Sequence, residues 1–361
     1  MFGKLALINF WKNYKSLFLE RKGMGKLLMQ NTNNATDIWD ERYAEGKLVC
    51  TRPAVKGDPI DYTQHPLLYR NSVSLPLTGN PDKWVMDDIG ETYLTPAPER
   101  VLALGSGMAF IEETFVKKGF AKHIIAYEAS KTAVEAGRKR IKEAGLSDCI
   151  DLRCGNALEE NLPSGYFDVV FVQAAIHHFF EIEAMFQLMH LVLKPGGLLI
   201  YDEYIGPDHH MYDSHVMDVI NEINACLAPE YQHDSLSNSR RMNLPPMSLE
   251  WMLNHDPSEG VHASDILPLT YQYFDVVRRR DYGGTIMRPF WVGILPNFNF
   301  DDPKDATVAR LIVLLERLLT KHSIIPHYHT TVVARRSDVV RAALSPEERE
   351  GINLSNWNAP A

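Results

Sequence analysis

The sequence is poor in the features that mark several special classes of protein. It holds four cysteines in 361 residues, and no two of them form a CxxC pair. Four cysteines are too few for a disulfide framework in a chain of this length, so we expect a reducing, cytoplasmic compartment. No apolar run reaches the roughly 18 residues of a membrane-spanning helix. Glycine and proline are near average usage, which excludes collagen-like and low-complexity chains.

Basic residues are also in deficit. The chain has 37 lysines and arginines against 46 aspartates and glutamates, for a formal net charge of -9. This charge argues against binding of nucleic acid by uniform electrostatic attraction, so we expect no nucleic-acid partner. The chain is 45% hydrophobic, which is enough to bury a sizeable core in one enlarged domain or two.

The first thirty residues depart from this acidic average. They contain six lysines and arginines and one acid, Glu20, and residues 4–30 space their apolar side chains as an amphipathic helix does. Polar residues from Asn9 to Lys15 interrupt the apolar stretch, so it resembles neither a signal peptide nor an anchor. Two interpretations remain open: peripheral contact with a membrane surface, or packing on the protein's own core or on a second copy in a homodimer. We favour packing, because most amphipathic helices are ordinary surface helices.

From residue 100 onward, short apolar runs alternate with helical stretches. This alternation is typical of βαβ units that build a parallel sheet with helices on both faces. Sheets of this kind bind ligands at the carboxyl ends of their strands. The expected strands are 100–104, 123–127, 150–153, 167–172 and 197–201, and the expected helices between them are 109–118, 131–144 and 182–193.

The regular alternation stops after Pro207. Two further strand patterns, at 273–279 and 328–335, complete an expected α/β fold, a Rossmann-like, doubly wound sheet of seven mostly parallel strands. The expected segments are an N-terminal helical segment and lid (1–75), the ligand-binding core (76–207), an inserted helical cap (208–265), the segment of the sixth strand (266–284), a second insertion (285–325), the last strand with a helix (326–343) and a flexible tail (344–361).

The second insertion contains a strongly apolar helix over residues 306–322. Its apolar side chains occupy more than one face, so we expect them to be covered, with the helix either closing the acceptor pocket or forming a dimer contact. These side chains are Val308, Leu311, Ile312, Val313, Leu314, Leu315, Leu318 and Leu319.

A glycine-containing turn joins the first strand to the first helix of the core. It reads Leu104-Gly105-Ser106-Gly107. Glycine lets the backbone turn sharply and approach a ligand closely, and the amide groups at the start of the following helix face that ligand. A GxG turn alone is a weak signal, because most such turns only connect a strand to a helix.

Two further strand ends carry residues that strengthen the signal. Glu128 follows the second strand, 23 positions after Gly105, where a carboxylate can accept both hydroxyls of a ribose. Asn156 and Ala157 follow the third strand, where an adenine ring would lie. Glu128 could instead cap a helix, and Asn156 could be a turn residue. Their occurrence together, at successive strand ends, predicts a nucleoside-binding site.

These motifs resemble those of class I S-adenosylmethionine-dependent methyltransferases over most of the chain, from Trp39 to about Arg336. The block 167–178 (FDVVFVQAAIHH) is similar to the family's fourth-strand motif, and 193–197 (LKPGG) to its turn before the fifth strand. Trp39 to Tyr43 resembles a W-x-x-x-Y segment that folds over the cofactor. The resemblance implies S-adenosylmethionine as cofactor. The residues that it assigns to cofactor binding are Tyr43, Leu104, Gly105, Ser106, Gly107, Glu128, Ala129, Asn156, Ala157 and Gln173.

The sequence departs from the family at two positions of the glycine turn. Ala103 stands where many relatives have an acid, and Ala109 stands where they have a third glycine, so recognition of the cofactor's amino group stays unassigned. The missing third glycine also argues against a dehydrogenase, because a dinucleotide pyrophosphate needs G-x-G-x-x-G. The methyltransferase interpretation is therefore preferred.

Acceptor chemistry is expected where the fourth and fifth strands end. Methyl transfer needs an acceptor lone pair in line with the methyl group, and a hydroxyl acceptor also needs a base. His177 and His178 follow the fourth strand and Glu203 follows the fifth. We predict His178 as the base ahead of Glu203, since an imidazole accepts a proton near neutrality. The predicted acceptor-binding residues are Tyr204, His209, Arg241 and Tyr282.

A metal site is not expected at these strand ends. The histidines between positions 177 and 215 show no HxxxH or HxH spacing, the usual sign of paired imidazole ligands. Histidines and carboxylates are nevertheless abundant here, and they are the ligand types of a mononuclear metal centre.

The phrase Glu203-Tyr204-x-Gly206-Pro207 resembles a bacterial branch of these enzymes that is associated with glycan or natural-product tailoring. The resemblance implies methyl transfer to a small-molecule or sugar hydroxyl. Two alternatives stay open. One is C- or N-methylation of a keto acid, amino acid or peptide, with or without a metal, and the other is a module that binds S-adenosylmethionine without turnover.

Overall fold

The computed structural model describes residues 35–44, 61–345, 347–349 and 352. The amphipathic helix predicted at 4–30 lies outside these residues, and so does most of the predicted flexible tail. In the part of the chain that is described, no helix is long and apolar enough to cross a membrane.

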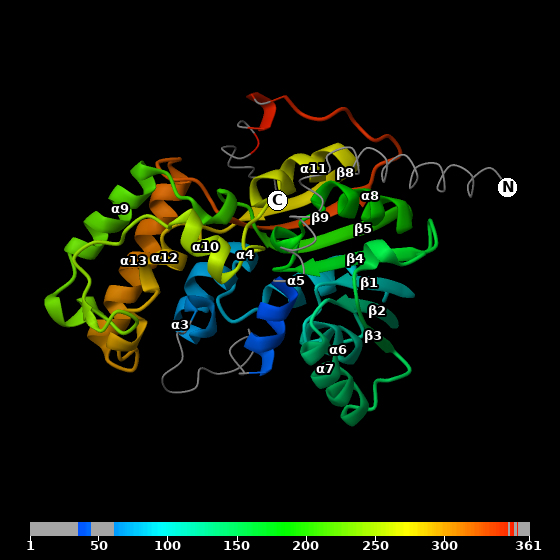
Figure 1. Cartoon of the computed structure of the whole chain (residues 1–361), viewed down its shortest axis with the longest axis horizontal. Helices are drawn as coiled ribbons and strands as arrows, with labels where there is room; N and C mark the ends of the chain where they lie inside the picture. Colours follow the sequence, from blue (N-terminus) through cyan, green and yellow to red (C-terminus); the bar gives the residue numbers. More distant parts are fainter. Residues whose placement is uncertain (1–34, 45–60, 346, 350–351, 353–361) are drawn as a thin grey trace.

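A seven-stranded sheet organises the structure (Figure 1). Its order is β3-β2-β1-β4-β5-β9-β8, in which the first five strands are parallel and β9 runs antiparallel to both of its neighbours. This confirms the predicted Rossmann-like, doubly wound fold. The strands are β1 (Arg100–Leu104), β2 (His123–Glu128), β3 (Ile150–Cys154), β4 (Phe167–Gln173), β5 (Leu193–Tyr204), β8 (Phe274–Asp281) and β9 (His329–Arg336).

Helices bury both faces of the sheet. The central strands are continuous apolar runs, as strands buried on two faces must be, and residues 101–104 of β1 and 169–172 of β4 are all buried. One face packs against α8 (Ile182–Val192) and α11 (Ile266–Tyr273), and the other packs against α5 (Val85–Tyr93), α6 (Phe110–Lys117) and α7 (Lys131–Glu143).

The order of strands reverses between β1 and β4. After β1 the chain adds β2 and β3 on one side, and β4 and β5 then extend the sheet on the other side. Loops that leave the carboxyl ends of β1 and β4 therefore diverge, which opens the crevice where doubly wound sheets bind their ligands. The glycine turn at 105–107 and the segment 174–178 leave these two strands.

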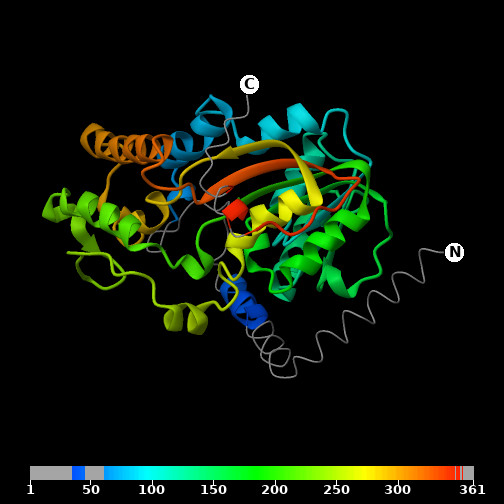
Figure 2. The same ribbon diagram turned by 90° about the horizontal axis from the view of Figure 1, so that it is seen from above.

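Most of the remaining helices lie in two insertions. The first follows β5 and contains α9 (Ser214–Ala225), α10 (Leu249–His255) and a two-stranded sheet of β6 (His233–Asp234) and β7 (Ser239–Arg240). The second follows β8 and contains α12 (Met287–Trp291) and α13 (Pro303–Lys321). Helices α9, α12 and α13 enclose a separate apolar core with α3 (Pro66–Tyr69), at the end of the molecule away from β3 (Figures 1 and 2).

Two predicted segments differ in part from the structure. The strand pattern at 273–279 corresponds to β8, which starts at Phe274, but residues 266–273 of the segment predicted around it form the buried helix α11. A run of buried apolar residues has no period that separates helix from strand, so this helix was not predicted. The predicted helix after β9 is absent from 337–345, where Arg341 donates to the carbonyl oxygens of Tyr271 and Phe274 and so ties an irregular segment to α11.

The apolar helix predicted at 306–322 is present as α13, but only one of its faces is covered. Ile312 and Val313 pack in the separate core. A helix that lies on a surface buries one stripe of its side chains, and the rest of α13 faces outward. Leu311, Leu314, Leu315 and Leu318 are exposed within the described chain, so the expected cover by a dimer contact stays a prediction.

Candidate active site

The glycine turn after β1 needs both of its glycines. Gly105 and Gly107 have φ values of 66° and 52°, in the left-handed region that favours glycine. A Cβ atom at Gly105 would lie 2.3 Å from the Cβ of Ala175, and one at Gly107 would lie 2.6 Å from the hydroxyl oxygen of Tyr43. The turn is therefore held against both the segment after β4 and the helix at 35–44.

Glu128 fixes the turn from the end of β2. Its Oε2 accepts a hydrogen bond from the amide of Gly107 at 2.8 Å, and its Oε1 accepts one from the amide of Ser130 at 2.8 Å. Burial raises the pKa of this carboxyl, although the amide bonds favour the charged form. Each carboxylate oxygen can accept a second hydrogen bond, so the group keeps acceptor sites for the two hydroxyls of a ribose.

The predicted adenine side is less distinctive. Asn156 accepts a hydrogen bond from the amide of Leu158 at 3.0 Å and so caps the short turn Ala157–Glu159. Its oxygen keeps one lone pair and its amide nitrogen keeps both protons, so either can contact adenine. Gln173, at the end of β4, has a buried side-chain oxygen without a partner among the described residues. An orphan acceptor of this kind is one that a ligand satisfies.

The helix at 35–44 bridges the cofactor loops and the first insertion. On one side, Asp40 accepts a hydrogen bond from the hydroxyl of Ser130 at 2.5 Å. On the other side, Arg42 forms an ion pair with Asp256 at 2.7 Å. This segment, predicted to be a cofactor lid, thus connects the loop after β2 to the loop before α11.

His177 and Glu203 form a buried dyad at the ends of β4 and β5. The imidazole Nδ1 lies 2.6 Å from Glu203 Oε2, and Oε1 of the same carboxylate accepts hydrogen bonds from the amides of Ala175 and Ile176 at 2.5 and 2.6 Å. Burial lowers the pKa of His177, but the Glu203 carboxylate outweighs it and raises that pKa above its usual value. The carboxylate therefore holds a proton on Nδ1 and leaves the Nε2 lone pair for chemistry.

His178 is held by a second carboxylate through a hydroxyl. Ser258 Oγ donates to Asp256 Oδ1 at 2.6 Å, and His178 Nδ1 lies 3.1 Å from the same Oγ. Because the hydroxyl proton goes to Asp256, Nδ1 is the donor to Ser258, and Nε2 again keeps its lone pair. Burial and the neighbouring His177 lower the pKa of His178 to about 4. The edge of Trp39 packs on this ring, with 4.6 Å between the ring centroids.

The two free Nε2 atoms face the carboxylate of Glu259. Its Oε1 lies 3.9 Å from Nε2 of His177, and its Oε2 lies 3.9 Å from Nε2 of His178. Arg288 donates to Oε1 at 2.9 Å, and His210 Nε2 lies 2.7 Å from it. Burial opposes the charged form, but Arg288 outweighs it and holds the pKa of Glu259 well below its usual value. The cluster therefore contains three proton acceptors, which are the two imidazole Nε2 atoms and the Glu259 carboxylate, next to the Arg288 cation.

The same three side chains are a candidate metal centre, because their ligand atoms all lie within 4.8 Å of one another. Two features favour proton transfer. Arg288 already neutralises the Glu259 carboxylate. The 3.9 Å separations also exceed the roughly 3.0 to 3.4 Å expected between ligands that share one ion at about 2.1 Å. The absence of a metal stays a prediction.

Three of the four predicted acceptor-binding residues lie around this cluster. The ring centroid of Tyr204 is 6.2 Å from that of His177, and His209 Nδ1 lies 3.0 Å from the carbonyl oxygen of Glu259. Tyr282 lies next to them, with its ring centroid 5.5 Å from that of His329, which is also 5.5 Å from Tyr204.

Arg241, the fourth predicted residue, lies apart from the cluster. Its guanidinium donates to Asn224 Oδ1 at 3.0 Å and to the carbonyl oxygen of Val292 at 3.0 Å. These contacts join the two insertions to each other. The structure does not bring Arg241 to the histidines.

Sequence reasoning missed most of the partners that hold the cluster. Ser258 and Glu259 lie in the loop between α10 and α11, and Arg288 lies in α12. They are far along the chain from His177, and no motif or spacing marks them. All three residues belong to the two insertions, so their positions depend on how these insertions pack against the sheet.

A buried carboxyl beside the glycine turn was also missed. Glu112, in the first turn of α6, is 3% exposed. Burial raises its pKa to about 7, and the hydroxyl of Ser106 and the charge of Arg140 offset only part of that rise. An acid in the first turn of a helix is ordinary, so no sequence pattern marks this residue.

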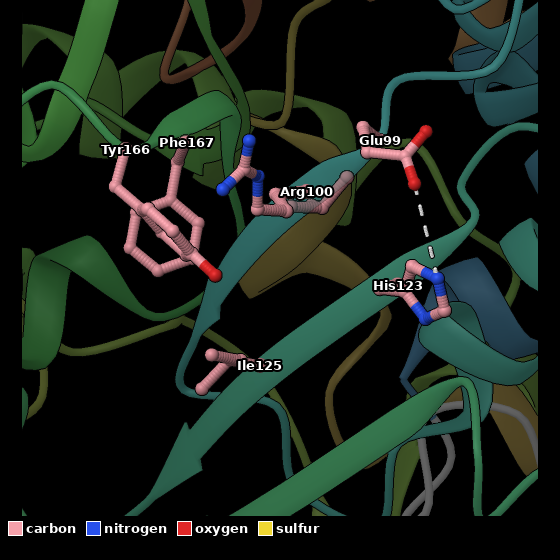
Figure 3. Close-up of a pocket in the computed structure, with 7 residues that line it drawn as sticks. Glu99, Arg100, His123, Ile125, Tyr166 and Phe167 are labelled. Carbon is pink, nitrogen blue, oxygen red and sulfur yellow. Dashed lines mark ion pairs between the residues drawn. The ribbon is translucent and has the colours of Figure 1, made fainter.

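A surface hollow lies at the opposite edge of the sheet (Figure 3). Its volume is about 350 Å3, and its lining includes Arg100, His123 and Tyr166, near the starts of β1, β2 and β4. Glu99 and His123 face each other across it at 3.9 Å. Doubly wound sheets bind ligands at the carboxyl ends of their strands, so this hollow is not part of the candidate site.

Known proteins support the class that the fold and the site define. Residues 102–201 match the family described as "Methyltransferase domain". The curated relatives include the ubiquinone/menaquinone biosynthesis C-methyltransferase UbiE of Vibrio campbellii, which is 28% identical over 163 residues, or 43% of this chain and 62% of that protein. The same enzyme of Yersinia pestis is 26% identical over 176 residues, or 46% of this chain and 69% of that protein.

Solved structures with a related fold include a geranyl diphosphate methyltransferase in complex with GPP and sinefungin. It is 12% identical, with a TM-score of 0.43, over 70% of this chain and 77% of that one. The [4+2]-cyclase SpnF is 16% identical, with a TM-score of 0.40, over 77% of this chain and 97% of that one.

These matches support the predicted class over part of the chain. Residues 102–201 form a methyltransferase domain, and S-adenosylmethionine is the cofactor of the class I methyltransferases that the motifs resemble. The chain spans 62% of the length of the Vibrio relative that it matches.

We predict that Glu128→Gln weakens S-adenosylmethionine binding by roughly 10- to 150-fold. The change removes the charge from hydrogen bonds to the ribose, which is worth about 1.5 to 3 kcal/mol. Titration calorimetry measures the affinity, with Glu135→Gln on the exposed side of α7 as the matched control. Equal affinities for the wild type and Glu128→Gln would remove Glu128 from the cofactor site.

We predict that Glu112→Gln stabilises the cofactor-free protein, and more at pH 8 than at pH 5. The pKa of Glu112 is raised to about 7 in the folded state, so its ionisation between about pH 4.5 and 7 costs folding free energy that glutamine does not. The gain at pH 8 should be roughly 2 to 3 kcal/mol. Urea unfolding at both pH values measures it, and a gain that does not change with pH would contradict the assignment.

Proposed function

We propose that this protein transfers a methyl group from S-adenosylmethionine to a hydroxyl group of a small-molecule or sugar acceptor. The observation that carries the proposal is the buried dyad of His177 and Glu203, with a free imidazole Nε2 beside the crevice of the sheet. A hydroxyl group is a poor nucleophile until it loses its proton, so such an acceptor needs a base at this place.

The described residues fit the cofactor. Glu128 offers a carboxylate to the ribose, and Gln173 has a buried oxygen without a partner among the described residues. Glu112 beside the turn offers a carboxyl to the cofactor's amino group, the contact that the sequence left unassigned. When bound, the cofactor supplies an electrophilic methyl group on a sulfonium sulfur.

The chain's own task is to orient the acceptor and to take its proton. The acceptor hydroxyl lies against His177 Nε2, which accepts the proton as the new oxygen–carbon bond forms. Glu203 stabilises the imidazolium that results, because it is bonded to the other ring nitrogen. Glu203 is buried behind the ring, so it acts through His177 as a positioning residue.

This proposal changes the order of the candidate bases. The sequence favoured His178, but burial and the adjacent His177 lower the pKa of His178 to about 4, which makes it a weak base. The pKa of His177 is raised instead, by the Glu203 carboxylate and against burial. His178 keeps a role in placing the acceptor, through its own free Nε2.

The surroundings of the dyad suit a hydroxylated ring. Tyr204 and Tyr282 present aromatic rings, and Arg288 lies over the Tyr204 ring at 5.8 Å. Aromatic faces pack on sugar and phenol rings, and the cations and imidazoles around them donate hydrogen bonds to ring hydroxyls. Trp39 packs on His178, so the helix at 35–44 forms one side of the acceptor's surroundings.

C-methylation of a phenol or enol is a second candidate, which the names of the relatives favour because both are C-methyltransferases. A base that takes the proton of a phenol also makes the neighbouring ring carbon nucleophilic. The same dyad therefore serves both reactions. They differ in the product, which proton and carbon NMR of the methylated acceptor distinguishes.

We predict that His177→Ala lowers turnover by roughly 100- to 10,000-fold with little change in S-adenosylmethionine affinity, because it removes the base and not a cofactor contact. Release of S-adenosylhomocysteine measures turnover, with a panel of sugars and phenols as acceptors. Glu203→Gln keeps the acceptor for the two amides but loses the charge that raises the pKa of His177. The midpoint of its pH–rate profile should therefore move to lower pH.

The matched control is His123→Ala, an exposed histidine at the opposite edge of the sheet. Full turnover by His177→Ala would remove His177 from the reaction. Loss of wild-type turnover in a chelator, with recovery on adding a divalent ion, would assign the cluster to metal chemistry. Binding of S-adenosylmethionine without methylation of any acceptor would favour the inactive module.

A further inference from the structure

Helix α13 carries a row of exposed apolar side chains. Leu311, Leu314, Leu315 and Leu318 have the spacing of a single helix face, and Ile324 follows just beyond the helix. These five residues, which we call the leucine face, are between 37% and 58% exposed. Large apolar side chains grouped in this way mark an interaction surface, whereas single ones scattered over a protein do not.

Basic side chains border the leucine face. Arg310, Arg317 and Lys321 recur at helical spacing along one edge, and Lys304 lies near the start of the helix. All four are exposed. A helix with leucines on one stripe and lysines and arginines beside it has the pattern of an interfacial helix.

The two acids of α13 point inward. Asp305 accepts a hydrogen bond from the hydroxyl of Tyr231, and Glu316 accepts one from the amide of Ile286 at 2.6 Å. Both carboxylates are buried. From Pro303 to Lys321 the exposed side of the helix therefore carries only positive charge, in a chain whose net charge is -9.

The positive charge distinguishes between two partners that could cover the leucine face, a second copy of the chain and an anionic membrane. A second copy of the chain would bring the edges with Arg310, Arg317 and Lys321 near their own copies, and like charges repel. An anionic surface is complementary to the same edge. A bilayer with acidic headgroups also accepts the leucines, because its acyl boundary lies only about 5 to 10 Å below the headgroups.

No other described element covers the leucine face, whose side chains are exposed. Both views place α13 at the end of the molecule away from β3 (Figures 1 and 2). Its buried side holds the segment that leads to Arg288, since Glu316 accepts hydrogen bonds from the amides of Ile286 and Met287. The leucine face is thus separated from the acceptor cluster by this one helix and the segment behind it.

We propose that the leucine face and its basic edge dock on the surface of a membrane that contains anionic phospholipids. The leucines enter the boundary between headgroups and acyl chains, and the lysine and arginines meet the headgroup phosphates. The proposal rests on α13 alone and does not depend on the proposed reaction.

Sedimentation with sucrose-loaded vesicles tests the proposal on the full chain. We expect binding to vesicles of phosphatidylcholine with phosphatidylglycerol and far weaker binding to phosphatidylcholine alone. The double variant Arg317→Glu with Lys321→Glu should weaken binding by at least about 30-fold, since each cation near an anionic surface contributes roughly fivefold. Leu314→Ser with Leu318→Ser should also release the protein, because it removes the buried apolar area.

The matched control is Lys139→Glu with Lys142→Glu on α7, which makes the same change in net charge on another exposed helix. It should leave vesicle binding within about twofold of the wild type, because those lysines lie outside the docking face. An equal loss in this control would overturn the proposal, because net charge alone would then explain binding. All variants should keep the wild-type thermal unfolding and S-adenosylmethionine affinity, since every changed side chain is exposed.

Two further outcomes would overturn the proposal. Wild-type protein that stays in the supernatant with anionic vesicles would exclude a membrane as the occupant. If light scattering then shows a dimer that the leucine variant converts to a monomer, the face is an interface between copies of this chain.

Discussion

The candidate site depends on the hydrogen bonds that the buried carboxylate of Glu203 makes. The carboxylate accepts hydrogen bonds from the amides of Ala175 and Ile176 and lies 2.6 Å from His177 Nδ1. These contacts shape the turn after β4, and Ala175 of that turn packs so closely on Gly105 that a Cβ there would lie 2.3 Å away. One side chain of β5 therefore sets both the imidazole and one wall of the cofactor turn. Without these partners, a buried carboxylate would cost several kcal/mol.

The site residues that directly follow parallel strands could be predicted from the sequence. His177 and Glu203 follow strands that are neighbours in the sheet, and parallel neighbours bring their carboxyl ends to one edge, so their proximity could be predicted from strand order. No such rule covers the insertions. Glu259 and Arg288 reach the cluster from segments placed by long-range packing, which no local period encodes. Helix α11 was not predicted for a different reason, because uniform burial removes the period that separates helix from strand.

Four glutamates near the crevice show how surroundings set chemistry. Glu112 is buried without a dominant cation, and its pKa rises to about 7. Glu128 is bonded by two amides, yet burial still raises its pKa, whereas Arg288 outweighs burial at Glu259 and holds that pKa well below its usual value. The carboxylate of Glu203 bonds to the imidazole of His177, and its negative charge raises the pKa of that histidine. The sequence shows four identical residues, and their roles differ only through partners that the fold supplies.

The charge of α13 and the charge of the whole chain have opposite signs, and this makes docking directional. An anionic bilayer repels most of the surface of a chain with a net charge of -9. At physiological salt that repulsion fades beyond about 8 Å, so only the charges nearest the membrane count. When the leucine face touches the bilayer, those nearest charges are Arg310, Arg317 and Lys321. Docking through this face therefore keeps the basic edge within the screening length of the headgroups. In that orientation the segment held by Glu316, and the acceptor cluster beyond it, lie directly behind the helix that meets the lipid.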